Sequence, residues 1–438
     1  MTLTRTTLAV GLAVLFRTAP VRAQTREPLC TIARVRRLLA LSDFAPAPGE
    51  RMAFASFPTS PTGTRPARAA ALLPSVRPGG SSSASPGADA TGITVLRVDE
   101  SLAVVGRPEF VRLPDSPRAT ARMPVAVSVE NGILVLARAD DTLMSFVVPA
   151  EGPPTAPTVV ATLPPIDPAH TSPSASPSPV AHGFAWLTAT ARDNATVVAL
   201  AGTTDGQVVA VTLRPDGRPT SMAHVWPRRV GGPMQLLPLP NGPLAAFVGR
   251  PVPGTGPRNE QARVQVLVHL DERLEPAGEL FATGFAQFPF ATLARGRSLV
   301  VFQWSETQGL AIATLPVGER RVGEQLPRLW TAVPPIDGAP AGHAAALGTN
   351  SIAYDSALYV EDNGGVRLHL AWLPPDGVPV IRRDVFATRM LLGTPPVSLA
   401  ADDGVVTLLA GRDETGSALD AVHLHCELVT VPPRGPSD

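Results

Sequence analysis

The sequence predicts an all-β protein, and three observations support this fold class. Apolar residues make up 44% of the 438 residues, which is enough for a substantial core. The 49 Pro and 37 Gly interrupt the chain more often than long helices tolerate. Short runs rich in Val and Leu alternate with polar turns, and none extends into a helix-length amphipathic pattern.

One unit recurs along the chain: a short apolar run, a polar turn and a second apolar run. Such a unit predicts a β-hairpin, because both runs have strand length and turn residues bound them. Six units are visible, and they begin roughly 47 to 64 residues apart. A four-stranded repeating sheet needs about 40–50 residues, so each unit has room for flanking strands. In the fifth unit these are expected at 344–347 and 380–386. The paired runs are 133–136 with 143–148, 197–200 with 208–211, 244–248 with 264–268, 299–302 with 310–315, 358–360 with 366–370, and 405–409 with 422–424.

The two ends of the chain complete this series. Runs at 52–57, 93–98 and 102–105 predict a seventh unit, interrupted by a long loop. The last unit lacks a fourth strand, and residues 31–41 are expected to supply it. Pairing the terminal strands would remove two exposed sheet edges, which otherwise promote aggregation.

This rhythm of strands resembles the β-propeller superfamily over most of residues 30–431. The resemblance implies one domain over 24–438 with six or seven blades, closed into a ring by the N- and C-terminal strands. It rests on strand spacing, because the chain has no repeated Trp-Asp ending, no paired-Gly kelch pattern and no Asp-box. No propeller family's active site is therefore carried over. Two β-sandwich domains are the alternative, since short strands with frequent turns suit both folds.

The N-terminus predicts a secretory signal peptide over residues 1–23. Arg5 precedes a short apolar stretch at 8–16, and Val21-Arg22-Ala23 provides a small-residue cleavage site. The stretch is shorter than the ~20 residues that span a bilayer, and no later run is long enough. We therefore expect export to the periplasm, the cell surface or the medium, with no transmembrane segment.

Cysteine usage agrees with export, because Cys30 and Cys426 are the only cysteines. In an oxidising compartment an even pair indicates a disulfide, which here would join both ends of the mature chain. The typical stabilisation from such a bond is about 2–4 kcal/mol. The alternatives are a lipid anchor at Cys30 and two separate buried thiols.

Two segments, 58–92 and 149–179, depart from the repeat. Both are rich in Pro, Ser and Gly, including the runs at 79–83 and 172–177. Such a composition does not bury a core, so the sequence predicts disordered loops here.

Charge and motifs exclude several classes of function. The chain has 37 basic and 37 acidic residues, and every basic one is Arg. The absence of Lys excludes a Schiff-base Lys and the phosphate-binding Lys of a P-loop. Zero net charge without a basic cluster argues against a nucleic-acid partner. The chain also lacks the motifs of zinc peptidases, α/β-hydrolases and dinucleotide-binding domains.

Four histidines are weak candidates for metal ligands. His182 and His343 each precede an apolar run that we place as the innermost strand of a unit, where they would face a central channel. Two ligands are too few, and a loop histidine with a local hydrogen bond is the alternative. His423 and His425 lie two apart on a strand and so share one face, as metal ligands or as a polar outer surface. The sequence predicts no cofactor, and it leaves a bound metal ion as an alternative.

Acidic residues occupy turns at 140–141, 205, 361–362, 402–403 and 413–414. If they gather on one rim, they can bind Ca²⁺ or a cationic partner. Asp is also a usual turn residue, because its side chain satisfies nearby backbone groups. We take the turn role as the primary interpretation.

The absence of a catalytic set favours an exported, non-enzymatic binding or scaffold protein. It would hold a protein or glycan through loops on one face of the ring and is expected to be a monomer. The alternative is a hydrolase or lyase, with or without a metal, that acts in the concave central channel. Ionisable residues from at least three blades at one channel mouth would favour the enzyme.

Overall fold

The computed structural model describes residues 25–40, 51–58, 67–77, 90–114, 123–163, 183–230, 233–239, 244–251, 263–282, 291–295, 298–305, 309–316, 330–332, 355–362, 365–373, 380–401 and 403–431. All named elements of this part are β-strands, so the all-β prediction is confirmed. The described residues contain no helix long and apolar enough to cross a membrane.

The described strands form seven antiparallel sheets. Six of them follow one another along the chain, and the closing sheet joins the first strand to the last four. Sheet 1 consists of β2 (Ala53–Ser56), β3 (Ala69–Arg77), β4 (Ala90–Val98) and β5 (Glu109–Arg112). Sheet 2 consists of β6 (Val125–Val129), β7 (Gly132–Ala139), β8 (Thr142–Val148) and β9 (Thr158–Thr162). Sheet 3 consists of β10 (Phe184–Asp193), β11 (Thr196–Thr203), β12 (Val208–Leu213) and β13 (His224–Val225). Sheet 4 consists of β14 (Met234–Pro238), β15 (Leu244–Pro251), β16 (Arg263–Leu270) and β17 (Pro276–Ala282). Sheet 5 consists of β18 (Ala291–Arg295), β19 (Ser298–Ser305), β20 (Gly309–Pro316) and β21 (Trp330–Ala332). Sheet 6 consists of β22 (Asp355–Asp362), β23 (Val366–Leu373) and β24 (Val380–Thr388). The closing sheet consists of β1 (Thr25–Ala40), β25 (Leu391–Leu392), β26 (Val397–Ala401), β27 (Gly404–Asp413) and β28 (Gly416–Val431).

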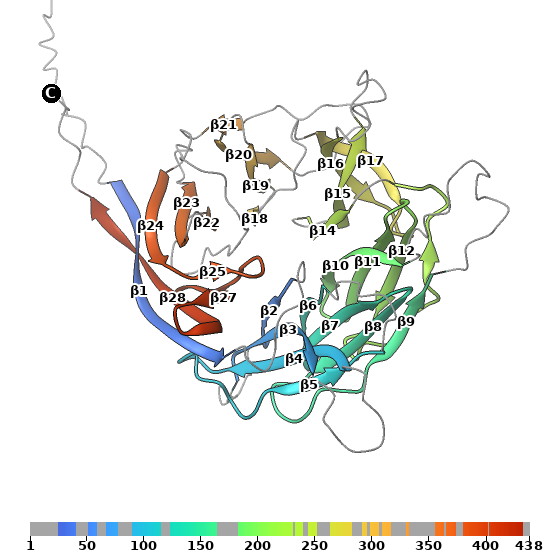
Figure 1. The fold of residues 1–438 in the computed structure, drawn as a ribbon. Helices are drawn as coiled ribbons and strands as arrows, with labels where there is room; N and C mark the ends of the chain where they lie inside the picture. The colour runs from blue at the N-terminus through green and yellow to red at the C-terminus, as the bar shows by residue number, and fades with distance from the viewer. Residues whose placement is uncertain are drawn as a thin grey trace, which may run out of the picture.

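The sheets stand side by side around a central opening (Figure 1). In sheets 1 to 4 the first strand lies nearest the opening, and β6 contacts both β2 and β10. The chain is therefore a β-propeller, as the strand rhythm predicts. Two β-sandwich domains do not fit, because sheet 2 packs one face on sheet 1 and the other on sheet 3. All six hairpins lie where the sequence places them, and the predicted strand over 380–386 is β24. The strand expected at 344–347 lies outside the described residues.

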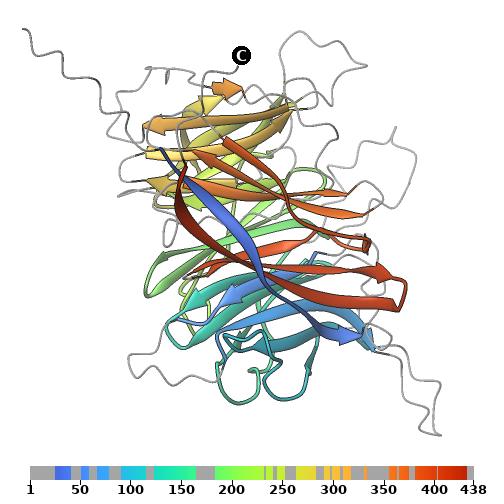
Figure 2. The ribbon, with the colours of Figure 1, turned by 90° about the vertical axis from the view of Figure 1, so that its left-hand side faces the viewer.

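The ring is closed by the N-terminal strand, as predicted. β1 pairs along almost all of β28, from Thr25 opposite Val431 to Ala40 opposite Ala418. It is longer than the segment expected from the sequence and forms the outermost strand of the closing sheet. Figure 2 shows β1 lying across the outside of the molecule beside β28.

Two kinds of bond reinforce this pairing. Cys30 and Cys426 face each other in the register and form a disulfide, with their Cα atoms 4.1 Å apart. The predicted disulfide is thus confirmed, and the described residues contain no free cysteine. Further along β1, the Arg37 guanidinium pairs with Asp413 and with Asp420, whose carboxylate oxygen lies 3.0 Å from Nε. A covalent bond and an ion-pair cluster therefore hold β1 at two points.

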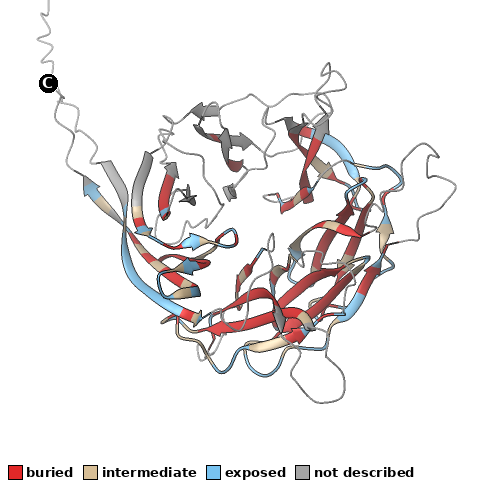
Figure 3. Ribbon diagram, in the orientation of Figure 1, coloured by how far each residue is buried: buried red, intermediate tan, exposed pale blue. Residues whose placement is uncertain are grey.

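The core lies between the sheets rather than at the centre of the ring (Figure 3). All of β7 is buried, because its odd and even residues pack against different neighbouring sheets. Strands buried on both faces read as continuous apolar runs, which explains the Ile133–Leu136 run. Complete burial of a side chain such as Phe146 contributes about 1.5–3 kcal/mol.

Arginine side chains link neighbouring sheets through what we call the outer connection, the segment between the third and fourth strands of a sheet. These segments are residues 99–108, 149–157, 214–223 and 271–275 in sheets 1 to 4. Arg34 of β1 donates to the Ser101 carbonyl in the outer connection of sheet 1. Arg97 of β4 donates to the carbonyls of Pro149 (3.0 Å) and Gly152 (2.6 Å) in the outer connection of sheet 2.

The next two outer connections are held in the same way by other side chains. The Ser145 hydroxyl of β8 donates to the Gly217 carbonyl at 2.7 Å. His224 Nε2 of β13 lies 2.6 Å from Glu275 Oε1. In four successive grooves, therefore, a polar side chain of one sheet holds the outer connection of the next.

The two predicted disordered loops are in part wrong. Residues 69–77 form β3, and 158–162 form β9. Ala70, Ala71 and Leu72 are fully buried between sheets, because small side chains let neighbouring sheets approach closely. Composition averaged over 58–92 concealed this short apolar strand. Apart from residues 58, 67–77, 90–92 and 149–163, both predicted loops lie outside the described part.

Reduction of the disulfide is expected to destabilise the fold by about 2–4 kcal/mol, because it frees the ends of a chain closed over 396 residues. Urea unfolding of the oxidised and dithiothreitol-treated protein measures the difference. A double variant, Cys30→Ala with Cys426→Ala, serves as the control and should be insensitive to reductant. Equal midpoints for oxidised and reduced wild type would contradict the role of the disulfide.

Arg97→Met is expected to cost about 2–4 kcal/mol, since it leaves Glu109 and two loop carbonyls without their buried donor. Arg97 Nη1 lies 2.8 Å from Glu109 Oε2, and the Arg97 side chain is only 7% exposed. Arg218→Met, at a side chain that is 77% exposed, is the matched control and should change stability little. Chemical unfolding of both variants gives the comparison; similar losses would count against the link.

The acidic partner of Arg37 makes ring closure dependent on pH. Hydrogen bonds from Thr415 and Arg37 lower the pKa of Asp413 from 3.8 to about 2. A carboxyl with a lowered folded-state pKa stabilises the fold above its unfolded pKa and loses this contribution as pH falls through the folded value. Wild type should therefore have a larger free energy of unfolding than Asp413→Asn. This difference should be at its full value above about pH 4 and disappear near pH 2. Urea unfolding across this range tests it, with exposed Glu414→Gln as control; a constant difference would contradict it.

Candidate functional site

The histidines expected to face the channel, His182 and His343, lie outside the described residues. Their role as metal ligands stays a prediction. In the described part of the chain, no group of three or more His, Cys, Asp or Glu side chains is arranged to hold a metal ion.

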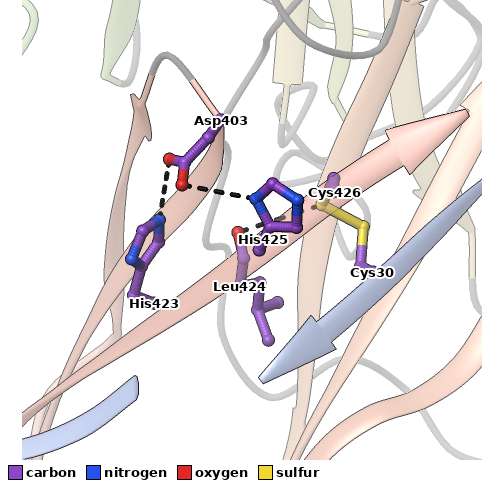
Figure 4. Close-up of a disulfide and its surroundings, with 6 residues drawn as sticks. All are labelled: Cys30, Asp403, His423, Leu424, His425 and Cys426. Carbon is purple, nitrogen blue, oxygen red and sulfur yellow. Dashed lines mark hydrogen bonds and ion pairs between the residues drawn. A yellow bond between two sulfur atoms is a disulfide. The ribbon is translucent and has the colours of Figure 1, made fainter. Parts of the chain in front are cut away.

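His423 and His425 share one face of β28, and both contact Asp403 in the turn between β26 and β27 (Figure 4). His423 Nε2 lies 2.9 Å from Asp403 Oδ1, and His425 Nδ1 lies 3.3 Å from Oδ2. Burial acts to raise the pKa of Asp403, but the charge of His423 and hydrogen bonds from both imidazoles outweigh it and hold the pKa below its ordinary value. The Asp403 carbonyl also accepts the Cys426 N–H at 2.9 Å. This cluster ties the turn to the strand that carries the disulfide.

The acidic turns of the described part form no cluster able to hold a metal ion, although several of them share one face of the ring. Successive connections of an antiparallel sheet alternate between the two faces of the ring, so Asp140, Asp205 and Asp413 lie on one face and Asp403 on the other. Asp205 accepts from Thr203 and pairs with Arg229 at 2.5 Å, while Asp413 caps the Thr415 N–H at 2.7 Å. Local contacts thus account for Asp205 and Asp413, whereas Asp402 lies outside the described part.

The inner strands that the structure describes carry few ionisable residues. β2, β6, β14 and β26 contain Ala, Val, Leu, Phe, Met, Ser, Gln and Pro but no ionisable residue. β10 has Arg192 and Asp193 only at its exposed end, and β18, the first strand of sheet 5, ends in Arg295. The convergence of ionisable groups that would favour a channel enzyme is therefore not seen in these six strands.

A different hollow lies between sheets 3 and 4, with a volume of about 330 Å³. Its walls come from β12, the outer connection and β13 of sheet 3, and from the outer connection of sheet 4. These two connections occupy equivalent positions in neighbouring sheets and therefore lie on the same face of the ring. The hollow is lined by Ala210, Thr212, Ser221, Met222, His224, Glu272, Arg273 and Leu274.

The sheet 4 wall is a turn held by Asp271. The Asp271 carboxylate accepts the backbone N–H groups of Arg273 and Glu275, both at 2.9 Å. Leu274 has a positive φ of 66° and its side chain is buried between the sheets. This anchoring leaves Glu272 and Arg273 exposed on the rim, with their backbone positions fixed.

The sheet 3 wall combines a polar base with an apolar rim. The Thr220 N–H and hydroxyl both donate to the Thr212 carbonyl, at 2.8 and 3.1 Å, and so hold the connection against β12. Met222, two residues on, is 94% exposed. His224 reaches across the groove to Glu275. A fully exposed Met beside Ser, Arg and Glu is the composition of a surface able to contact a polar ligand with an apolar face.

Sequence reasoning missed this hollow, because its walls come from segments far apart in the chain, 221–224 and 271–275. Each segment had a signal of its own. Met222 is a large apolar residue within an otherwise polar connection, and Asp271 begins a charged turn that projects side chains outward. Nothing in either segment indicated that the two would meet.

No family model and no curated protein matches this chain. Among solved structures, AofleA from Arthrobotrys oligospora is 11% identical with a TM-score of 0.38, over 93% of this chain and 90% of that one. A neuraminidase-like protein of A/flat-faced bat/Peru is 13% identical with a TM-score of 0.38, over 73% and 92%. Trypanosoma rangeli sialidase in complex with the inhibitor DANA is 11% identical with a TM-score of 0.40, over 75% of this chain and 57% of that one. Likenesses this distant carry no argument about function.

Proposed function

We propose that the protein is an exported, non-enzymatic binding protein that holds a glycan or protein partner on one face of its ring. The observation that carries the proposal is the hollow between sheets 3 and 4. Two outer connections form much of it. The one in sheet 3 is bonded to β12, and the one in sheet 4 is a turn closed by its own hydrogen bonds. A rigid scaffold that presents polar connections is typical of binding sites, because little conformational entropy is lost on association.

Export is supported by the disulfide. Disulfides persist in oxidising compartments and are rare in the cytosol, so a bond that joins Cys30 to Cys426 favours the periplasm, the cell surface or the medium. The alternative function, a hydrolase or lyase in the channel, has no supporting cluster of ionisable side chains in the described inner strands. The binding role is therefore the better supported of the two.

The mature, oxidised protein should bind saturably to members of a glycan array or to proteins of the producing cell's surface, captured by cross-linking. It should not hydrolyse a panel of p-nitrophenyl glycosides in the same buffer. A heat-denatured sample controls for non-specific adsorption. Turnover of any glycoside would contradict the non-enzymatic role. If the protein binds saturably neither to the glycan array nor to the surface proteins, the binding role is wrong.

A further inference from the structure

We propose that the hollow between sheets 3 and 4 binds one neutral, hydroxyl-rich ring, such as a terminal sugar of a glycan. This inference rests on the proposed binding function and assigns its site and ligand class. A volume of about 330 Å³ is at the small end of ligand pockets, which measure about 300–1,000 Å³. The hollow therefore accommodates a single ring rather than an extended oligomer.

The lining groups match the hydrogen bonding of a polyol. A sugar hydroxyl both donates and accepts, and neighbouring hydroxyls on a ring need acceptors and donors side by side. Glu272 supplies a carboxylate acceptor, and the adjacent Arg273 supplies a guanidinium donor. Hydrogen bonds to charged groups are stronger than those between neutral groups, so these two residues carry the polar contacts.

Apolar contacts are available on the opposite wall. Met222 lines the hollow and is 94% exposed. The thioether is polarisable and adapts its shape to the surface it meets. It thus offers a partner to the C–H face of a sugar ring, which a purely polar site would lack.

The charge of the lining favours a neutral ligand over an acidic one. Arg273 is the one arginine of the lining, and Glu272 lies next to it in the same turn. His224, the other basic side chain there, already contacts Glu275 at 2.6 Å. A ligand that carries a carboxylate or phosphate would meet the carboxylates of Glu272 and Glu275. No surplus positive charge in the lining would offset them.

The test uses protein labelled at the methionine methyl groups with ¹³C, so that Met222 reports on the hollow directly. Loss of one signal in Met222→Leu assigns it. Methyl α-D-mannopyranoside, methyl β-D-galactopyranoside and methyl α-L-fucopyranoside are the probes, with the methyl glycoside of N-acetylneuraminic acid as the acidic comparison. At least one neutral glycoside should shift the Met222 signal saturably, whereas the acidic one should not.

Arg273→Ala is expected to weaken this binding about tenfold or more, the effect of losing a charged hydrogen bond. Arg218→Ala is the matched control, because Arg218 is an exposed arginine in the outer connection of sheet 3 that does not line the hollow. It should bind like wild type. Both side chains are exposed, so neither change is expected to disturb folding, and near-UV circular dichroism verifies this.

Failure of the site is distinguishable from failure of the function. If the protein binds array glycans while the Met222 signal stays unchanged and Arg273→Ala binds like wild type, the assigned site is wrong and the binding function stands. If the acidic glycoside binds more tightly than the neutral ones, the ligand class is wrong. If the array and the methionine signals are both silent, the site and the glycan-binding role fall together.

Discussion

The antiparallel pairing of β1 with β28 joins residues from the two ends of the described chain, and the neighbouring sheets depend on it. The closing sheet buries one face against sheet 6 and the other against sheet 1. Opening the ring would expose apolar faces on both sides at once, as well as two sheet edges. The disulfide, the Arg37 ion pairs and the His–Asp cluster all lie in this one sheet, where loss of pairing would have the largest effect.

Links between neighbouring sheets convert this closed ring into a rigid support for its loops. In a chain without Lys, arginine makes two of the four links described above. A planar guanidinium presents five donors in a fixed fork, so Arg97 binds two carbonyls and Glu109 together. An ammonium group cannot reproduce that arrangement. The same links hold the outer connections, and therefore the surface that a partner would meet.

Sequence patterns predicted the features that depend on local order. Each hairpin has both strands and its turn within one short segment, so alternation and turn residues located all six, and the two cysteines indicated the ring closure. Features that depend on which sheets become neighbours were not predictable in this way. β3 was missed because its alanines become core only when sheets lie on both sides. The hollow and the contacts of Asp403 were missed because they join segments that are distant in the sequence.

Three of the four links also help to explain why the hollow lies between sheets 3 and 4. In the groove before it, Ser145 draws the buried Gly217 backbone onto sheet 2, where a Cβ at Gly217 would lie 3.2 Å from a Leu134 methyl. Between sheets 1 and 2, the buried Arg97 side chain occupies the corresponding space. Between sheets 3 and 4 the link is instead a contact between two side chains, His224 and Glu275, which are 40% and 26% exposed. This link joins the two walls through the tips of two side chains, and the hollow lies between the same two walls.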